Sequence, residues 1–377
     1  MKLPEIVKLK NLKGKRILLR VDFNVPIKDG TVIDDFRIQK VLPVIRFLKE
    51  NGAKTIILSH LGREKSDTLL PVSERLESEM EHVFVEDFQS EKGKLALSSL
   101  KDGEMALIQN LRKWDGEKNG DKSFAKSLAS LGDIFVNEAF AVSHRKDASV
   151  YALPELLPAY FGPLFIEEVE NLSSAFKEHH PFLFILGGAK FETKMPLIEK
   201  YLDLADTVFV GGALANTFFK LRGYEIGTSL VDETTPSMEH LLKNEKLILP
   251  ADVIVDGPSG RIVRSFDAVL PMEKISDDGP KTISMIKEYI GKAKFILWNG
   301  PLGNYEAGFD EATLAVATAL AGSEARVVLG GGDTVAAIEK LKITKDTIFV
   351  STGGGAMLDF LAKGTLPGID AVTKKEK

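Results

Sequence analysis

The first half of the chain alternates short apolar runs with longer segments in which apolar residues recur at helical spacing. Residues 16–23 predict a buried strand, and residues 54–59 predict the next one. Between them, apolar residues recur at intervals of three and four from Ile38 to Leu48, which is typical of one face of a helix. Two candidate caps and one candidate stop border this helix: Asp34, Asp35 and Gly52. A strand, a helix and a strand in this order predict a parallel pair with a right-handed crossover.

The same alternation continues to the end of the chain. Strands are predicted over residues 104–110 and 133–137, with a helix from Asp121 to Gly132 between them. A second series of apolar runs predicts strands over residues 182–186, 207–210, 247–255, 295–298, 326–329 and 347–351. Residues 165–176 lie between the two series and predict a helix with no strand before it.

This order of elements predicts an α/β fold with two doubly wound, Rossmann-like domains, each built on a parallel sheet. The helix over 165–176 is the natural connector, which places the boundary near residue 170. We therefore expect domains at 1–170 and 171–377. No pattern places residues 366–377, and these last residues could pack back on the first domain.

Composition narrows the class of protein. A chain of 377 residues is too long for one compact core, and 44% hydrophobic with 27% charged residues is ordinary for a globular protein. A net charge of −5 gives no broad basic field for nucleic acid. The absence of cysteine excludes disulfides, thiolate metal sites and cysteine nucleophiles. No apolar run approaches the roughly 20 residues of a membrane span, and residues 1–5 begin no signal peptide, so we expect a cytoplasmic protein without membrane partners.

Glycines follow the predicted strands of the second half. They occur in Gly187-Gly188, Gly211-Gly212, Asn299-Gly300-Pro301, Gly330-Gly331-Gly332 and Gly353-Gly354-Gly355. Glycine lets backbone amides approach a phosphate closely, and the helix that follows adds favourable partial charge. A single such turn is equally explained by tight packing of a strand on a helix, but the repetition favours a nucleotide-phosphate site. Neither a P-loop pattern nor a GxGxxG fingerprint is present.

Charged residues accompany these glycines. Asp333 and Thr334 open the helix after the triple glycine, where Asp333 could act only as a helix cap or could hold Mg²⁺ against phosphates. Lys190 and Lys194 are four residues apart and would face the same phosphate chain if that segment is helical, although such lysines are often only solvated. Glu306 could accept hydrogen bonds from ribose hydroxyls.

The first half carries polar and basic residues where its strands end. These are Asp22, Asn24, Arg37, His60, Arg63, Asn110, Arg112, His144 and Arg145. Arginines beside strand ends suit bidentate binding of carboxylate or phosphate oxygens, and any one of them alone could instead form a surface ion pair. Because the carboxyl ends of parallel strands meet at one edge, the set predicts an anion site.

With these residues in view, the chain resembles the phosphoglycerate kinase family along nearly its whole length. The stretches that carry the resemblance are Arg20-Val21-Asp22-Phe23-Asn24-Val25-Pro26, Ser59-His60-Leu61-Gly62-Arg63, Leu186-Gly187-Gly188-Ala189-Lys190, Trp298-Asn299-Gly300-Pro301, Gly330-Gly331-Gly332-Asp333-Thr334 and Ser351-Thr352-Gly353-Gly354-Gly355. The resemblance implies reversible phosphoryl transfer between 1,3-bisphosphoglycerate and ADP, giving 3-phosphoglycerate and ATP, as part of glycolysis and gluconeogenesis. It also implies Mg²⁺ with the nucleotide, and we expect a monomer.

The resemblance assigns roles residue by residue. It implies that phosphoglycerate is bound by Asp22, Phe23, Asn24, Arg37, His60, Leu61, Gly62, Arg63, Arg112 and Arg145 in the first domain. It implies that the nucleotide is bound by Lys190, Lys194, Glu306, Gly331, Gly332, Asp333 and Thr334 in the second, with Asp333 on the metal. Three segments depart from the family pattern: Gln109-Asn110, Phe140 to Arg145, and Glu273-Lys274-Ile275 in place of a Trp-Met-Gly near the adenine site. The last departure leaves the preference for the base open.

The chemistry implied requires no general base, because the attacking oxygen is already ionised near neutral pH. Catalysis would rest on alignment and charge neutralisation, for which Arg37 and Lys194 are the candidates, and the helix over 165–176 would allow hinge closure. Two other classes remain as alternatives. A nucleotide-sensing protein without turnover is disfavoured by the intact set of arginines and lysines, and an NAD-linked oxidoreductase by the missing fingerprint.

Overall fold

The computed structural model describes residues 3–177, 179–231 and 239–374. The chain divides into two compact units, one of residues 1–170 with 363–377 and the other of residues 171–362. Each unit is an α/β layer structure around a six-stranded parallel sheet, so the predicted fold class is confirmed. Among the described residues, no helix combines the length and apolar character that spanning a bilayer requires.

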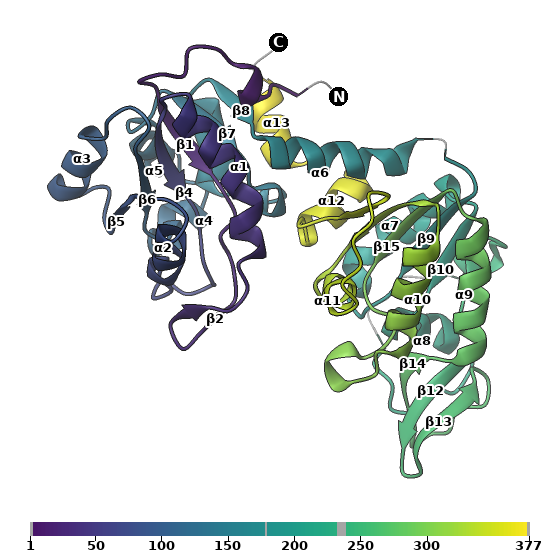
Figure 1. Ribbon diagram of the computed structural model, residues 1–377. Coiled ribbons are helices and arrows are strands. Elements are labelled where there is room, and N and C mark those ends of the chain that lie inside the picture. The colour runs from purple at the N-terminus through teal and green to yellow at the C-terminus, as the bar shows by residue number, and fades with distance from the viewer. Residues whose placement is uncertain (1–2, 178, 232–238, 375–377) are drawn as a thin grey trace. The chain divides into compact units, whose positions relative to one another are not determined.

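The sheet of the first unit has the strand order β5-β6-β4-β1-β7-β8 (Figure 1). Its strands are β1 (Arg16–Arg20), β4 (Lys54–Leu58), β5 (Val83–Val85), β6 (Met105–Ile108), β7 (Ile134–Asn137) and β8 (Ala159–Phe161). From β1 the chain adds β4 on one side, then the edge strand β5 and, between β4 and β5, strand β6; it resumes with β7 on the other side of β1. The crevice between the carboxyl ends of β1 and β7 is therefore the topological switch point, where open α/β sheets bind ligands.

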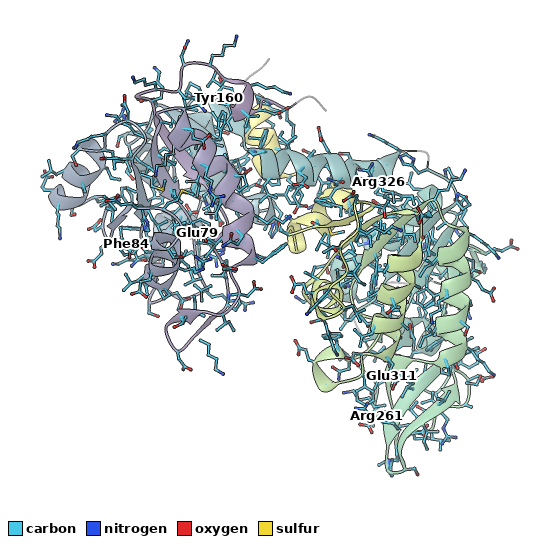
Figure 2. All side chains as sticks on the ribbon, viewed as in Figure 1. Glu79, Phe84, Tyr160, Arg261, Glu311 and Arg326 are labelled. Atoms are coloured by element: carbon cyan, nitrogen blue, oxygen red, sulfur yellow. The ribbon has the colours of Figure 1, made fainter. Side chains whose placement is uncertain are left out.

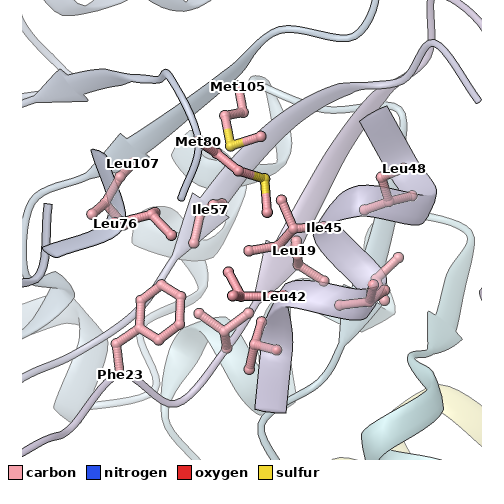
Figure 3. Close-up of a cluster of buried hydrophobic side chains, with 14 of the residues drawn as sticks. Leu19, Phe23, Leu42, Ile45, Leu48, Ile57, Leu76, Met80, Met105 and Leu107 are labelled. Atoms are coloured by element: carbon pink, nitrogen blue, oxygen red, sulfur yellow. The ribbon is translucent and has the colours of Figure 1, made fainter. Parts of the chain in front are cut away.

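Helices cover both faces of this sheet. They are α1 (Phe36–Glu50), α2 (Leu70–Glu77), α3 (Glu91–Ser98), α4 (Asp115–Lys118) and α5 (Lys122–Ala129). Alternate residues of β1 point to opposite faces, so Leu19 packs in one core cluster and Leu18 in the other. Figure 3 shows the first cluster, in which Leu42 and Ile45 of α1 lie beside Leu19 and Ile57 of the sheet.

The predicted helix ends are partly confirmed. The Asp121 side chain accepts a hydrogen bond from the Phe124 amide at 2.7 Å and caps α5. Asp35 is the N-cap residue of α1 but makes no side-chain cap, whereas Asp34 accepts from the Phe36 amide at 2.9 Å. Asp35 is instead bound by Gln39 and by the guanidinium of Arg75.

The sheet of the second unit has the order β11-β10-β9-β15-β16-β17, the doubly wound order with its switch point between β9 and β15. Its strands are β9 (Phe182–Leu186), β10 (Thr207–Val210), β11 (Leu247–Ile248), β15 (Phe295–Asn299), β16 (Arg326–Gly330) and β17 (Ile348–Val350). Its helices are α7 (Phe191–Leu204), α8 (Ala213–Leu221), α9 (Pro280–Lys292), α10 (Glu311–Gly322), α11 (Gly332–Lys340) and α12 (Gly355–Lys363). Charged side chains such as Arg261, Glu311 and Arg326 are exposed on this unit (Figure 2).

Two predictions about strands were wrong. The run over 247–255 is two strands, because Pro250 has no amide hydrogen to donate and separates β11 from β12 (Asp252–Gly257). Strand β12 pairs antiparallel with β13 (Gly260–Ser265) and β14 (Lys274–Asp278) in a separate three-stranded sheet. In addition, a strand does precede the connecting helix, since β8 pairs with β7 and is followed directly by α6 (Pro163–Ser173).

The end of the chain belongs to the first unit. Helix α13 (Pro367–Thr373) is placed by a hydrogen bond from the Gly368 amide to the Ser143 carbonyl at 2.9 Å. A Cβ at Gly368 would lie 2.8 Å from the Ser143 side chain, so only glycine permits this approach. Residues 375–377 lie outside the described part of the chain.

Candidate active site

The polar residues of the first unit gather where β1 and β4 end. Asp22 follows β1, and its carboxylate is paired with the guanidinium of Arg37 from the first turn of α1. His60 follows β4 and lies with its Nδ1 3.8 Å from Asp22 Oδ1. The structure therefore brings together three of the predicted residues.

Four arginines act on the buried imidazole of His60. Burial lowers the pKa of His60 well below its ordinary value, and the positive charges of Arg20, Arg112, Arg145 and Arg37 lower it further. The ring is consequently neutral at physiological pH. The same arginines concentrate positive charge at this edge of the sheet, which favours an anionic ligand.

Arg112 reaches this edge from the short helix η2 (Leu111–Lys113) that follows β6. Its Nη1 donates to the Gly62 carbonyl, and within the described part of the chain its buried Nε has no hydrogen-bond partner. Asn110 fixes the turn, because its Oδ1 accepts from the Leu61 amide at 3.2 Å and from the Arg112 amide at 3.1 Å. Arg112 is thus fixed in position through Nη1, while its Nε–H remains available to donate a hydrogen bond to a ligand.

The remaining predicted residues of this site differ in their exposure. Phe23 and Leu61 are buried in the core, so only their backbone is available to a ligand. Asn24 Oδ1 accepts from the Gly62 amide at 2.9 Å, which joins the loops after β1 and β4. Gly62 has φ of +62°, and a Cβ there would overlap the Asp67 carboxylate. Arg63 is exposed, and its backbone carbonyl accepts a hydrogen bond from Lys118 Nζ at 2.7 Å.

Behind His60 lies a buried set that the sequence patterns did not reveal. Arg20, Glu117 and Ser149 come from β1, α4 and the turn η4 (Ala148–Ala152), and all three are fully buried. Arg20 lies inside a strand, where alternation alone predicts a core position. Only its charge, which is costly to bury unpaired, was a signal that it has a partner.

In the second unit, the glycine turns pack directly on one another at the switch point. The Gly187 amide donates to the Asn299 carbonyl at 2.9 Å, and the Gly188 amide to the Pro301 carbonyl at 2.7 Å. A Cβ at Gly187 would overlap the Pro301 carbonyl oxygen, and a Cβ at Gly212 would lie 3.0 Å from the same oxygen. Tight packing is therefore one reason for these glycines.

A lysine ammonium lies against the same turns. Lys194, one turn into α7, is buried, and its Nζ donates to the Gly187 carbonyl. A Cβ at Gly300 would lie 2.6 Å from this Nζ, so the missing side chain makes room for the charge. Burial lowers the pKa of Lys194 to about 8, the charge of Lys190 acts in the same direction, and Asp333 opposes them.

Helix α11 starts at Gly332, the last of the three consecutive glycines. Gly331, with φ of +107°, is its N-cap residue, and Asp333 lies in its first turn. The alternative that Asp333 is the cap is therefore not realised. Thr334 Oγ1 accepts from the Gly300 amide at 3.1 Å, which ties the ends of β15 and β16 together.

Asp333 is the predicted metal residue. Within the described ranges, no group of three or more His, Cys, Asp or Glu residues could hold a metal ion. Mg²⁺ usually binds one or two protein carboxylates and completes its shell with phosphate oxygens and water. A single carboxylate at a helix start, near Lys194, fits that mode of binding.

The other predicted nucleotide residues are exposed. Lys190 is the N-cap residue of α7, so it precedes the first helical turn rather than sharing a helical face with Lys194. Glu306 lies in the short helix η8 (Tyr305–Ala307). In the segment that departs from the family, Glu273 is buried and pairs with Arg264 at 2.7 Å.

The comparisons with known proteins agree over almost the entire chain. The phosphoglycerate kinase family model matches residues 7–364. The chain is 40% identical to phosphoglycerate kinase of Clostridium beijerinckii, covering 96% of both proteins, and 40% identical to that of Moorella thermoacetica, covering 97% of this chain and 98% of the relative. Among solved structures, phosphoglycerate kinase of Coxiella burnetii matches with a TM-score of 0.86 and 38% identity over 100% of both chains. That of Pyrococcus horikoshii matches with a TM-score of 0.84 and 33% identity over 96% of both.

Proposed function

The chain belongs to the phosphoglycerate kinase family, and we propose that it catalyses the reversible reaction of 1,3-bisphosphoglycerate with ADP to give 3-phosphoglycerate and ATP. The observation that carries this proposal is that the two sheets hold different chemistry at the carboxyl ends of their strands. The first has arginines around a neutral histidine, and the second has glycine turns with one buried lysine and one carboxylate. These suit a small multiply charged anion and a nucleotide, respectively.

In the direction of ATP use, a carboxylate oxygen of 3-phosphoglycerate attacks the γ-phosphorus of ATP. The bond from that phosphorus to the bridging oxygen of ADP breaks as the new bond forms. No proton moves, because both oxygens are ionised. Arg37 and Lys194 are the catalytic residues in this proposal, and they lower the barrier by neutralising charge on the transferring group.

The first unit would bind phosphoglycerate through residues of its 1–170 segment. The residues proposed to bind it are Asp22, Phe23, Asn24, Arg37, His60, Leu61, Gly62, Arg63, Arg112 and Arg145. Their side chains differ in how far they are fixed before a ligand binds. Arg37 and Arg112 are already held by partners, whereas Arg63 is exposed. Exposed Arg63 would therefore be ordered by the ligand.

The second unit would bind the nucleotide through Lys190, Lys194, Glu306, Gly331, Gly332, Asp333 and Thr334. Asp333 would hold Mg²⁺, which neutralises phosphate charge when it is bound. The amides at the start of α11 would donate to phosphate oxygens. We further propose a cytoplasmic, glycolytic enzyme that acts as a monomer.

Steady-state assay with 3-phosphoglycerate and MgATP tests the proposal. Turnover that requires both substrates and yields ADP would support it. Calorimetric binding of MgADP without any turnover would favour the nucleotide-sensing alternative. Kinetics with the nucleoside triphosphates ATP, GTP and ITP would show how Glu273 and its neighbours affect the preference for the base.

A further inference from the structure

The buried guanidinium of Arg20 is held from two sides. Its Nε donates to Ser149 Oγ at 2.8 Å, and its Nη1 donates to the Val21 carbonyl. Glu117 completes the set, since its Oε1 lies 3.9 Å from Arg20 Nη2. Arg20 is 0% exposed, so these partners compensate a charge that water does not reach.

Ser149 links the two charges. Its hydroxyl donates to Glu117 Oε1 at 2.5 Å, and its amide donates to Glu117 Oε2 at 2.9 Å. The carboxylate is therefore fixed by two hydrogen bonds from one residue. A guanidinium bound to the same hydroxyl through Nε has little freedom to rotate.

The remaining nitrogen, Nη2, points to the imidazole ring. It lies 3.4 Å from His60 Nδ1. A guanidinium can only donate hydrogen bonds, so Nδ1 must offer a lone pair in this contact. A neutral imidazole carries one proton, which then resides on Nε2.

The competing tautomer would need an acceptor at Nδ1. Asp22 Oδ1 is one candidate, but its distance of 3.8 Å from Nδ1 is too long for a hydrogen bond. That oxygen already accepts from the Asn24 amide at 3.1 Å, and the other oxygen of Asp22 is paired with Arg37. Asp22 therefore does not favour a proton on Nδ1.

We propose that Arg20, held by Glu117 and Ser149, is a positioning residue that fixes His60 as the Nε2–H tautomer and so presents an uncharged donor to the anion site. The inference rests on the proposed function only for the identity of the ligand, an oxygen of phosphoglycerate. A neutral donor adds a hydrogen bond among the arginines without adding a further positive charge there. This arrangement also excludes His60 from proton transfer.

Long-range ¹H–¹⁵N spectra of the ligand-free protein labelled on histidine nitrogens test the proposal. The chain has 6 histidines, and a His60→Gln variant assigns the signals of this ring. We expect the pattern of a neutral ring protonated on Nε2. A proton on Nδ1, or a ring charged at pH 7, would overturn the proposal.

Variants separate positioning from simple stability. Arg20→Met leaves Glu117 buried without its partner, so the double variant Arg20→Met/Glu117→Leu, which removes both charges, is the one to measure. We expect a mixture of tautomers and phosphoglycerate affinity lower by about tenfold, the effect of losing one hydrogen bond to a charged group, with MgADP affinity unchanged. A folded double variant with the original tautomer and affinity would contradict the proposal.

Arg16→Met is the matched control. Arg16 lies at the other end of the same strand and pairs with Asp133 at 2.7 Å. We expect it to change neither the tautomer nor phosphoglycerate affinity. If the unaltered protein bound no 3-phosphoglycerate, the proposed function would fail, whereas the tautomer is read without any ligand.

Discussion

The two candidate half-sites both lie at the carboxyl ends of parallel strands, but one is built mainly from side chains and the other mainly from backbone. In the first unit, the candidate site is formed by charged side chains. Arg37, Arg112 and Arg20 are each held in place by a hydrogen-bond or ion-pair partner. In the second unit, the turns Gly187-Gly188 and Asn299-Gly300-Pro301 offer backbone groups, and the absence of side chains makes the space. One fold type thus presents two different arrangements of groups that could bind an anion.

The difference follows from the shape of the ligands proposed. A small anion offers compact carboxylate and phosphate groups, and the paired oxygens of each suit planar guanidinium groups. A polyphosphate chain carries several anionic groups in a row, and backbone amides at the helix starts along the edge of the sheet can each donate to one of them. The first site should therefore be sensitive to loss of side chains, and the second to their addition.

The largest expected effect tests the side chains of the first site. Arg37→Ala should lower kcat at least about a hundredfold, because removing one preorganised charge at a reacting group typically costs ~10²–10³ in rate. Nucleotide affinity should be nearly unchanged. Steady-state kinetics and calorimetry measure both.

Arg46→Ala is the control for that variant, since Arg46 lies on the same helix and pairs with Glu79 on the surface. It should retain activity close to that of the unaltered protein. An Arg37→Ala enzyme that kept a third of kcat would remove Arg37 from catalysis and weaken the contrast between the sites.

The next effect tests the backbone of the second site. Gly187→Ala places a Cβ on the Pro301 carbonyl oxygen, which cannot rotate away as a side chain would. We expect a loss of about 1–3 kcal/mol in the free energy of unfolding, the usual cost of overpacking, together with weaker nucleotide binding. Urea denaturation followed by circular dichroism gives the stability.

Gly291→Ala is the matched control, because Gly291 lies in α9 with open space around its Cβ direction. Alanine there should stabilise the helix by up to about 1 kcal/mol. If both alanine variants behaved alike, crowding at the glycine turns would not be the reason for Gly187.

A smaller effect is expected at Asp333. Asp333→Asn should weaken MgADP binding by about tenfold, or about 1.4 kcal/mol, while leaving ADP binding in the presence of a chelator nearly unchanged. Calorimetry with and without Mg²⁺ distinguishes the two. Equal losses in both conditions would mean that Asp333 serves only the start of α11.

The smallest expected effect is the uptake of protons by Lys194 when the nucleotide binds. Burial lowers the pKa of this lysine to about 8, so it is about half protonated at pH 8 without ligand. A phosphate group favours the charged form and raises that pKa, so nucleotide binding at pH 8 should take up roughly half a proton. Calorimetry in buffers of different ionisation enthalpy measures this uptake.

The lowered pKa of Lys194 also determines how the free energy of unfolding changes with pH. Because the folded pKa of Lys194 is below its ordinary value, the unfolded chain binds more protons above pH 8, and this group favours folding increasingly as pH rises towards 10. Lys194→Met should abolish the proton uptake at pH 8. Uptake that persisted in this variant would assign it to another group.

The sequence predicted what depends on local pattern. Strands β9 and β10 have the predicted bounds, because each is an apolar run that ends at a glycine turn. Strand β8 was not predicted, since three residues between Pro158 and Gly162 show no periodicity. Proline at 250 was the local signal that divides the run over 247–255.

The position of a candidate residue was predictable where it closely follows a strand, as His60 follows β4. It was not predictable where partners meet only through the fold. Arg20 and Ser149 are 129 positions apart, and nothing in either segment indicates the other. The N-cap at Gly331 rather than Asp333 likewise depends on where the backbone of α11 first turns.

Helix α13 gives the first unit a particular order of assembly during synthesis. The chain emerges from the ribosome N-terminus first, yet residues 363–377 complete the unit that begins at residue 1. The second unit is one continuous stretch, 171–362, and is fully synthesised earlier. The unit that begins earlier in the chain is therefore completed later than the second unit, and the surface beside Ser143 stays uncovered until Gly368 has been synthesised.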